Sequence, residues 1–368
     1  MHRIAQSWLV LEITGDARML GFVVAAQFAP MLFLAPWAGV LADRYDRRRL
    51  LQLTQIGMGL QALALGLLTL SGHATGALVL VFAAILGVVT ALDGPARQSI
   101  VSDLVPSDQV VNAVALNSAN FNAARLVGPA IAGVMIAAWG PGWVFLVNAA
   151  TFAVMYLALT RIHLTRREGS RRAGGLRDGL RYVRARPDLW FVIATAGAVA
   201  MLVFNFPITI ALMVSNEFAA DARSYGILAS LMAVGSLAAA LIQARRGRTD
   251  LKLVAVAAVA AGGAVILAGL MPTVPTFAAA LVACGAAALT MMTGANSYLQ
   301  THTDAEHRSR VMALYMAVFF GTTPAGAPLI GMLADDFGPR AAMVLPGAAS
   351  LVVTAGLVAA FVWARRRA

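Results

Sequence analysis

The stretch Gly39-Val40-Leu41-Ala42-Asp43-Arg44-Tyr45-Asp46-Arg47-Arg48-Arg49 joins two long apolar runs and is itself densely charged. The surrounding sequence is apolar enough for lipid, so two Asp and four Arg residues in so short a segment indicate a connection at a membrane face. Gly39 allows two backbones to approach closely, and Asp43 is placed to accept hydrogen bonds at a helix end. The arginines are expected to hold this tight connection on the cytoplasmic side.

The composition excludes an ordinary soluble domain. Hydrophobic residues make up 60% of the 368 positions and charged residues 12%, whereas soluble domains carry about 25% charged residues. Runs of about 20 apolar residues indicate helices that cross a bilayer, and the period-two alternation of a transmembrane barrel is absent from the sequence. The single cysteine and five scattered histidines form no disulfide framework or metal-ligand pattern. We therefore predict an all-α polytopic membrane protein that is not an enzyme and needs no cofactor or metal.

Eleven apolar segments are long enough to span the membrane, and a shorter one precedes them. They cover residues 20–41, 50–70, 75–96, 113–138, 143–161, 189–214, 224–244, 252–270, 276–298, 311–334 and 341–363, with the short segment at 4–13. If residues 39–49 are cytoplasmic and the segments alternate in direction, all Lys and Arg residues except Arg3, Arg18, Arg125, Arg223 and Arg340 fall at the cytoplasmic face. This positive-inside pattern predicts a cytoplasmic C-terminus and explains the net charge of +11 without a nucleic-acid partner.

The sequence also contains two related halves. Asp16-Ala17-Arg18-x-x-Gly21 recurs as Asp221-Ala222-Arg223-x-x-Gly226, and glycines recur at a fixed offset of about 200 positions, as Gly140 and Gly338 do. We predict an N-terminal helix bundle at 1–160, a basic cytoplasmic linker at 161–187 and a C-terminal helix bundle at 188–368. The linker either forms a short amphipathic helix around Leu176–Val183 or stays flexible.

The first helix is expected to be incomplete. In the second half 33 residues (188–220) precede Asp221, whereas only 15 precede Asp16. A helix of about 11 residues rises roughly 16 Å, which is half of a hydrocarbon core about 30 Å thick. This comparison with the second half predicts a chain that is shortened at its N-terminus.

Two charged residues near the end of the fourth segment are spaced to pair on one helix face. Asp93 and Arg97 stand at positions i and i+4, and Gly94-Pro95 between them is expected to bend the helix. An acid in a membrane segment is costly unless it is paired or takes part in transport. Asp93 is therefore either a proton- or substrate-gating carboxylate or one half of a structural ion pair that braces the cytoplasmic gate.

The fifth segment is the most polar membrane stretch. Asn122 and Arg125 share a helix face with Ser118 and are candidates to line the cytoplasmic half of a central cavity. Arg125 there would bind substrate or a counter-carboxylate; the alternatives are pairing with the Asp43 region or snorkelling to the interface. The motif Gly128-Pro129-x-x-x-Gly133 follows, with a proline expected to kink the helix and glycines that permit close helix contact.

Several of these stretches resemble the major facilitator superfamily. Residues 39–49 resemble its signature loop between helices 2 and 3, G-x-L-A-D-R-x-x-R-[RK], and Gly128-Pro129 resembles the helix 5 motif of its drug and metabolite antiporters. The matching loop residues are Gly39, Leu41, Ala42, Asp43, Arg44, Arg47 and Arg48. The stretches Ile4–Gly15, Gly94–Gln98, Asp103–Pro106 and Ala124–Pro129 are similar to the bacterial enterobactin-exporter-like and macrolide-efflux-like branch.

This resemblance implies a major facilitator fold of two parallel six-helix bundles, here with about eleven full spans and a partial first helix. It implies a monomer in the bacterial inner membrane that exports small hydrophobic or amphipathic molecules, such as drugs, siderophores or secondary metabolites, by alternating access and proton antiport. Gly39, Asp43, Arg44, Arg47 and Arg48 would form its conformational switch. The alternatives are an uptake permease or lysophospholipid flippase of the same fold, and a shortened membrane protein that does not transport.

Overall fold

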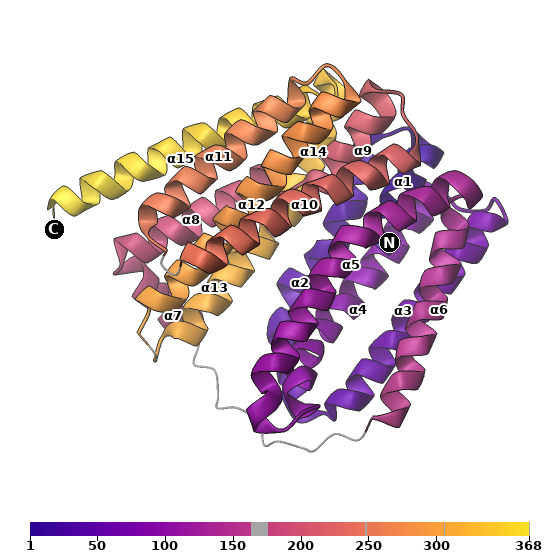
Figure 1. Cartoon of the computed structure of the whole chain (residues 1–368), viewed down its shortest axis with the longest axis horizontal. Helices are drawn as coiled ribbons and strands as arrows, with labels where there is room; N and C mark the ends of the chain where they lie inside the picture. Colours follow the sequence, from indigo (N-terminus) through magenta and orange to yellow (C-terminus); the bar gives the residue numbers. More distant parts are fainter. Residues whose placement is uncertain (163–175, 247–248, 305, 368) are drawn as a thin grey trace. The chain divides into compact units, whose positions relative to one another are not determined.

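The computed structural model describes residues 1–162, 176–246, 249–304 and 306–367. Within these ranges some side chains are not described, namely those of residues 35–36, 38–44, 98–99, 102–103, 107, 111, 114–115, 176–177, 244, 246, 309 and 364–367. All regular elements in the described ranges are helices, and eleven helical segments are long and apolar enough to cross a membrane (Figure 1). The all-helical, polytopic architecture predicted from hydropathy is thus confirmed.

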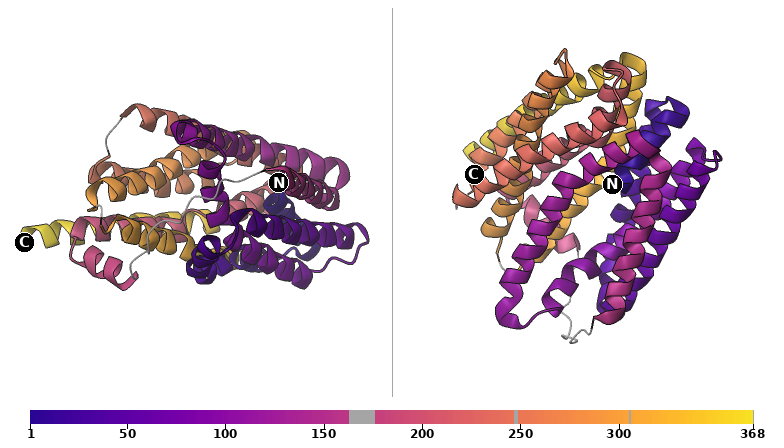
Figure 2. Two further views of the ribbon diagram at one scale, coloured as in Figure 1. Left: turned by 90° about the horizontal axis from the view of Figure 1, so that it is seen from below. Right: turned by 45° about the vertical axis from the view of Figure 1, so that its right-hand side comes forward.

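The chain divides into two compact units, each built around one helix that contacts most of the others. Unit 1 comprises Met1–Arg171 and Asp221–Ser230, and unit 2 comprises Arg172–Ala220 and Leu231–Ala368. Figure 2 gives two further views of the long helices within each unit. The predicted division at residues 161–187 stays a prediction, because residues 163–175 of that linker lie outside the described part of the chain.

In unit 1 the short helix α1 contacts α2, α4, α5 and α6. The helices of this unit are α1 (His2–Thr14), α2 (Ala17–Arg44), α3 (Arg47–Leu70), α4 (Gly76–Asp103), η1 (Ser107–Gln109), α5 (Val110–Trp139) and α6 (Pro141–Arg161), followed by the first turns of α10 (Ala222–Arg246). The buried Gln6 of α1 donates to the carbonyl of Val79 at 3.1 Å and accepts from Gln27 at 2.9 Å. These bonds satisfy buried amides, which would otherwise be costly in an apolar interior.

In unit 2 the helix α8 contacts α11, α12, α13, α14 and α15. The helices are α7 (Leu176–Arg184), α8 (Pro187–Leu202), α9 (Phe206–Leu212), the π-helical turn η2 (Met213–Glu217), the rest of α10 from Leu231, α11 (Leu251–Gly269), α12 (Val274–His302), α13 (Arg308–Gly321), α14 (Thr323–Phe337) and α15 (Ala341–Arg367). Glycines let backbones touch here: a Cβ on Gly285 would collide with the carbonyl of Met232, and one on Gly262 would lie 3.1 Å from the carbonyl of Gly347. Small residues at such crossings are the usual basis of helix packing in membranes.

The two halves related by the internal sequence repeat also have similar helix ends. Gly140 and Gly338 both follow a helix and have nearly the same backbone angles, with φ of 84° and 87°, a left-handed region that favours glycine. Asp16 accepts from the backbone N–H groups of Arg18 and Met19, and its counterpart Asp221 accepts from that of Ser224. Equivalent positions of the two halves therefore begin and end helices in the same way.

Two predicted spans are each broken into two helices. The segment expected at 189–214 stops at Leu202 and resumes at Phe206, and the segment expected at 311–334 is interrupted at Thr322. In both cases a proline, Pro207 or Pro324, stands in the first turn of the second piece. Because proline has no N–H to donate to the preceding turn, the helix cannot run through without loss of a hydrogen bond. By contrast, α4 and α5 continue through Pro95 and Pro129.

The described part of the linker forms α7, which is one of the two conformations expected for it. Gly179 and Val183 of α7 are buried, and Gly179 packs against the backbone of Arg310 on α13. Gly179 and Val183 of α7 thus lie against the protein itself, while Leu180 is exposed.

Candidate functional site

The connection between α2 and α3 is shorter than the sequence suggests. Helix α2 continues to Arg44, α3 begins at Arg47, and the Asp46 side chain caps α3 by accepting from the N–H of Arg49 at 3.0 Å. Asp43 therefore lies within the last turn of α2, and the observed capping acid is Asp46. The side chains of Asp43 and Arg44, like the surroundings of Gly39, lie outside the described part of the structure.

Arg48 joins the start of α3 to the end of α6. Its guanidinium group donates to the carbonyl oxygen of Thr160, in the last turn of α6. A cation at a helix C-terminus is favourable because the unpaired carbonyls there carry partial negative charge. Arg47, the other described arginine of the predicted switch, is half-buried. Arg48 thus holds two helix ends together at this face of unit 1.

Asp93 is the centre of a buried polar cluster between α3 and α4. Its carboxylate accepts from the hydroxyl of Thr54 at 2.7 Å and from the amide of Gln55 at 3.0 Å, both on α3. One turn along α4, Arg97 donates through Nε to Oδ2 at 2.6 Å and through Nη2 to Oδ1 at 3.2 Å. The predicted Asp93–Arg97 pair is therefore formed, with two further donors from the neighbouring helix.

This arrangement suits a charged carboxylate. The Asp93 side chain is 8% exposed and the Arg97 side chain 45% exposed, so the acid is buried while its partner reaches outward. Four donated hydrogen bonds stabilise the negative charge and tie α3 to α4. The sequence did not single out Thr54 and Gln55, although two adjacent polar residues in an otherwise apolar segment were the available signal.

The polar part of α5 does not join this cluster. Asn122 donates to the carbonyl of Ser118 on its own helix at 2.8 Å, and its side chain is exposed. Arg125 is also exposed and makes no hydrogen bond or ion pair with the residues that the structure describes.

The glycines of α5 differ sharply in their surroundings. A Cβ on Gly133 would lie 2.8 Å from the Cα of Gly226 and 2.7 Å from the carbonyl of Ala222, both at the start of α10. A Cβ on Gly226 would in turn collide with the carbonyl of Pro129. Gly128 has no comparable contact, since its nearest neighbour would be Met1 Cγ at 3.9 Å. The backbones of α5 and α10 therefore touch at Pro129 and Gly133, and Gly128 does not take part.

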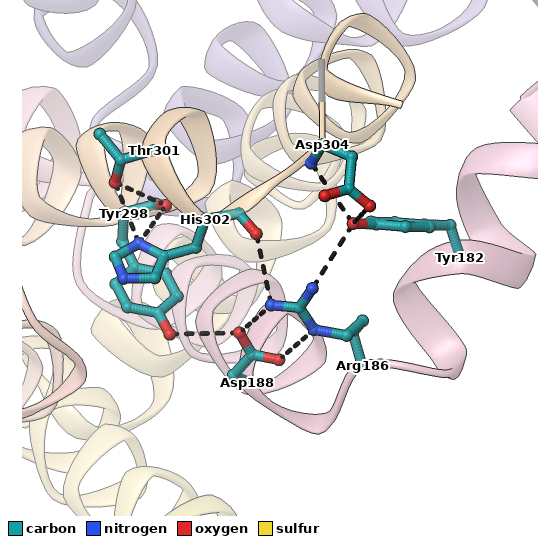
Figure 3. A network of polar contacts seen from close by, with 7 residues as sticks. All are labelled: Tyr182, Arg186, Asp188, Tyr298, Thr301, His302 and Asp304. Carbon is teal, nitrogen blue, oxygen red and sulfur yellow. Dashed lines mark hydrogen bonds and ion pairs between the residues drawn. The ribbon is translucent and has the colours of Figure 1, made fainter. Parts of the chain in front are cut away.

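A second polar cluster, which the sequence did not predict, holds α7 on unit 2 (Figure 3). The Tyr182 hydroxyl donates to Asp304 at 2.8 Å, and Arg186 donates to both carboxylate oxygens of Asp188 at 3.0 and 2.8 Å. Arg186 also reaches the carbonyl of His302 at 3.3 Å, and Tyr298 donates to Asp188 at 3.2 Å. We call these five side chains, with the carbonyl of His302, the α7 cluster.

The α7 cluster keeps its arginine charged. The hydrogen bond to Asp188 raises the pKa of Arg186 above its ordinary value, although burial acts in the opposite direction. Arg186 therefore remains a cation at any physiological pH. Among the residues that the structure describes, no group of three or more His, Cys, Asp or Glu side chains could hold a metal ion.

The fold is that of known membrane transporters. A bacterial homologue of the human lysosomal transporter Spinster, in an inward-facing and unoccupied conformation, superposes with a TM-score of 0.78 at 18% identity over 99% of this chain and 94% of the other. The nucleoside transporter NupG gives a TM-score of 0.77 at 13% identity over 98% and 96% of the two chains. At these identities the likeness establishes the fold alone.

Similar sequences are named as transporters and efflux proteins. The staphyloferrin A transporter of Staphylococcus aureus is 25% identical over 96% of this chain and 90% of its own. The multidrug efflux pump Tap of Mycobacterium tuberculosis is 27% identical over 97% and 88% of the two chains. The macrolide efflux protein A of Streptococcus pyogenes is 23% identical over 97% and 90%.

The model of one protein family, described as transmembrane secretion effector, matches residues 1–366. The match includes the α2–α3 connection, the Asp93 cluster and the α5 glycines described above. The chain therefore belongs to the transmembrane secretion effector family of major facilitator superfamily transporters, and is a multi-pass membrane protein that is not an enzyme.

Proposed function

We propose that this transporter exports small hydrophobic or amphipathic molecules from the bacterial cytoplasm by alternating access, driven by proton antiport. The relatives named as a multidrug efflux pump, a macrolide efflux protein and a siderophore transporter support export. The substrate belongs to the drug, siderophore or secondary-metabolite class.

The observation that carries this proposal is the backbone contact of α5 with the start of α10. Gly128-Pro129-x-x-x-Gly133 is the stretch that resembles the antiporter motif, and Pro129 and Gly133 of that stretch meet Gly226 with no room for a Cβ. Any side chain at Gly133 or Gly226 would push the backbones of α5 and α10 apart, so the two helices can cross this closely only with glycine at both positions. In an exporter such a crossing closes one end of the transport path while the other end opens.

The opposite end of unit 1 is proposed as the gate. The α2–α3 connection with Gly39, Asp43, Arg44, Arg47 and Arg48 is the switch. The Asp93–Arg97 pair, Asn122 and Arg125 are the candidates for proton and substrate contacts. Movement of one proton inward across 100 mV provides about 2.3 kcal/mol, which sustains a substrate gradient of roughly 50-fold at one-to-one coupling.

The proposal also includes the location, orientation and partners of the protein. The protein acts as a monomer in the inner membrane with its C-terminus in the cytoplasm, and its partners are protons, a small-molecule substrate and the lipid bilayer. The excess of Lys and Arg in the connections on one side supports this orientation, and it leaves no need for a nucleic-acid partner.

The test is accumulation of a panel of dyes and drugs in efflux-deficient bacteria that express this chain, with and without a protonophore. We expect lower accumulation of at least one compound and loss of the effect when the protonophore is added. Asp43→Asn in the same assay should restore accumulation while the protein still inserts. Unchanged accumulation of the whole panel despite verified insertion, or accumulation that rises with the protein, would contradict export.

A further inference from the structure

Arg3 and Arg125 of unit 1 lie among apolar helix residues and have no carboxylate partner among the residues that the structure describes. Arg3 lies in the first turn of α1, and Arg125 lies at the middle of α5. The Cζ atom of Arg3 stands 4.6 Å from the centroid of the Phe28 ring of α2. Both arginines are accessible, and neither has an ion pair within the described part of the chain.

Arg3 lies well inside the membrane layer. Phe28 is eleven residues beyond the start of α2 at Ala17, which corresponds to about 16 Å along a helix with a rise of 1.5 Å per residue. This distance is near the middle of a hydrocarbon core about 30 Å thick. Since Arg3 contacts Phe28, its guanidinium group is at the same depth.

Arg125 lies at a similar depth through the contact between α1 and α5. The start of α1 faces the middle of α5, where a Cβ on Gly128 would lie 3.9 Å from Met1 Cγ. Arg125 is three residues from Gly128, which is less than one helical turn or about 4.5 Å along the axis. Two cationic positions thus lie within about one turn of the same helix contact.

The acids of unit 1 whose side chains are described are engaged elsewhere or distant. Asp93 is bound by Arg97, while Asp16, Asp46 and Asp221 cap helices. Asp108 precedes the start of α5 at Val110, which is about 22 Å along the helix from Arg125. Glu12 is nine residues from Arg3 on α1, or about 13 Å along the helix. A cation at this depth is strongly disfavoured unless an anion or water accompanies it, and charged residues there are usually functional.

We propose that Arg3 and Arg125 bind the acidic group of the substrate, so that the transported molecules are amphipathic anions bearing a carboxylate or a phosphate. The inference rests on the proposed export function and narrows its substrate class. The planar guanidinium fork matches both anions in a bidentate manner. The face of the Phe28 ring supports one side of the Arg3 guanidinium group and leaves its N–H donors available to the anion.

The experiment measures transport into inside-out vesicles with one dye scaffold in three forms. The probes are an alkylated coumarin carboxylate, its methyl ester and the corresponding amine. Lysophosphatidylglycerol in a parallel arm offers a phosphate from a lipid source. The variants are Arg125→Gln, Arg125→Lys and Arg3→Gln. The matched control is Arg161→Gln, which removes an exposed arginine from the last turn of α6.

We expect the wild type to transport the carboxylate at least about tenfold faster than the amine. Arg125→Gln and Arg3→Gln should each reduce carboxylate transport by about tenfold or more and leave the ester unchanged. Arg125→Lys should retain an intermediate rate, and Arg161→Gln should match the wild type. A preference for lysophosphatidylglycerol over the coumarin carboxylate would identify a lipid as the source of the anion.

Equal losses for all three coumarin probes, or a wild type that prefers the amine, would overturn the inference while export stands. If the wild type transports no probe, the export proposal fails. A binding measurement on the purified protein then tests the anion site separately. Thermal stabilisation of the purified protein by the carboxylate probe, lost in Arg125→Gln, would support the site. Absence of that stabilisation in the folded wild type would refute it.

Discussion

Asp93 illustrates how much one buried charge depends on its neighbours. Its carboxylate is costly at that position unless donors surround it, and the donors come from Thr54 and Gln55 on α3 as well as from Arg97 on its own helix. The same residue therefore favours assembly of α3 with α4 and makes that assembly sensitive to its charge.

Replacement of Asp93 by asparagine should lower both the stability and the transport activity of the protein. The amide keeps one acceptor oxygen but removes the charge that binds Arg97, and a hydrogen bond to a charged group contributes about 1.5–3 kcal/mol. We expect a value near the lower limit because Arg97 is partly solvated. Thermal unfolding in detergent, followed by fluorescence size-exclusion, measures the effect. Asp108→Asn, at an exposed acid, is the control; an equal shift in both variants would contradict the role of the cluster.

Two glycines at different distances from their neighbours, Gly226 of α10 and Gly128 of α5, should differ in their tolerance of alanine. Gly226→Ala should destabilise the protein by about 1–3 kcal/mol, because its Cβ would overlap the backbone of α5. Gly128→Ala should be tolerated, since its Cβ would meet its first neighbour at 3.9 Å. Expression and unfolding temperature of the two variants provide the measurement. A Gly226→Ala variant as stable as Gly128→Ala would show that the helices separate freely at this point.

At the scale of elements, the ends of the helices are decided by local chemistry. Prolines interrupt two spans at Pro207 and Pro324, and aspartates begin α3 and α11 through Asp46 and Asp250. Each of these signals acts within a few residues of the chain. They divide the apolar sequence into helices of defined length without any requirement for contacts between helices.

The cap of α10 predicts a dependence on pH. Hydrogen bonds from the N–H and hydroxyl of Ser224 lower the pKa of Asp221 below its ordinary 3.8. A lowered pKa means that the cap stabilises the protein fully above the ordinary value and that the contribution is lost as the pH falls through the folded-state pKa. Asp221→Ala should therefore cost about 1 kcal/mol at neutral pH, and the difference from wild type should shrink below about pH 3.8. Unfolding in urea at pH 7, 5 and 3.5 tests this, and a difference that persists unchanged at pH 3.5 would contradict it.

The α7 cluster predicts that the linker helix is held by its tyrosine. Tyr182→Phe removes the hydroxyl that donates to Asp304 and accepts from Arg186. The loss of one such bond, about 1 kcal/mol, should raise trypsin cleavage at Arg181 and Arg184 roughly fivefold. Tyr45→Phe, at a tyrosine that is 65% exposed, is the matched control. Cleavage that rises equally in both variants would mean that the hydroxyl does not hold α7.

At the scale of the whole molecule, orientation in the membrane follows from the distribution of charge. A fluorescent protein fused after residue 363 should fold and fluoresce in the cytoplasm, and a periplasmic phosphatase inserted at Gly72, between α3 and α4, should be active. The excess of Lys and Arg on one side is the physical reason. A silent phosphatase at Gly72 together with an active one after residue 363 would reverse the predicted topology.

The sequence by itself determined the helical class, the eleven spans and the equivalence of the two halves. Hydropathy and capping are properties of short stretches, so they are readable without knowledge of contacts. The Asp93–Arg97 pair was predictable for the same reason, since both residues stand on one helix four positions apart. The breaks at Pro207 and Pro324 were also signalled locally, but the continuous apolar runs around them concealed the interruption.

The tertiary structure alone decided which residues meet across helices. Asp93 finds its donors 38 and 39 positions away on α3, Tyr182 finds Asp304 122 positions away, and Gly133 meets Gly226 on a helix that follows the linker. Such partners depend on how each helix is rotated about its axis and how far it is shifted along its neighbour. Helices that are apolar on nearly every side leave that rotation unspecified in sequence, so close packing of small residues and the need to satisfy buried polar groups fix it.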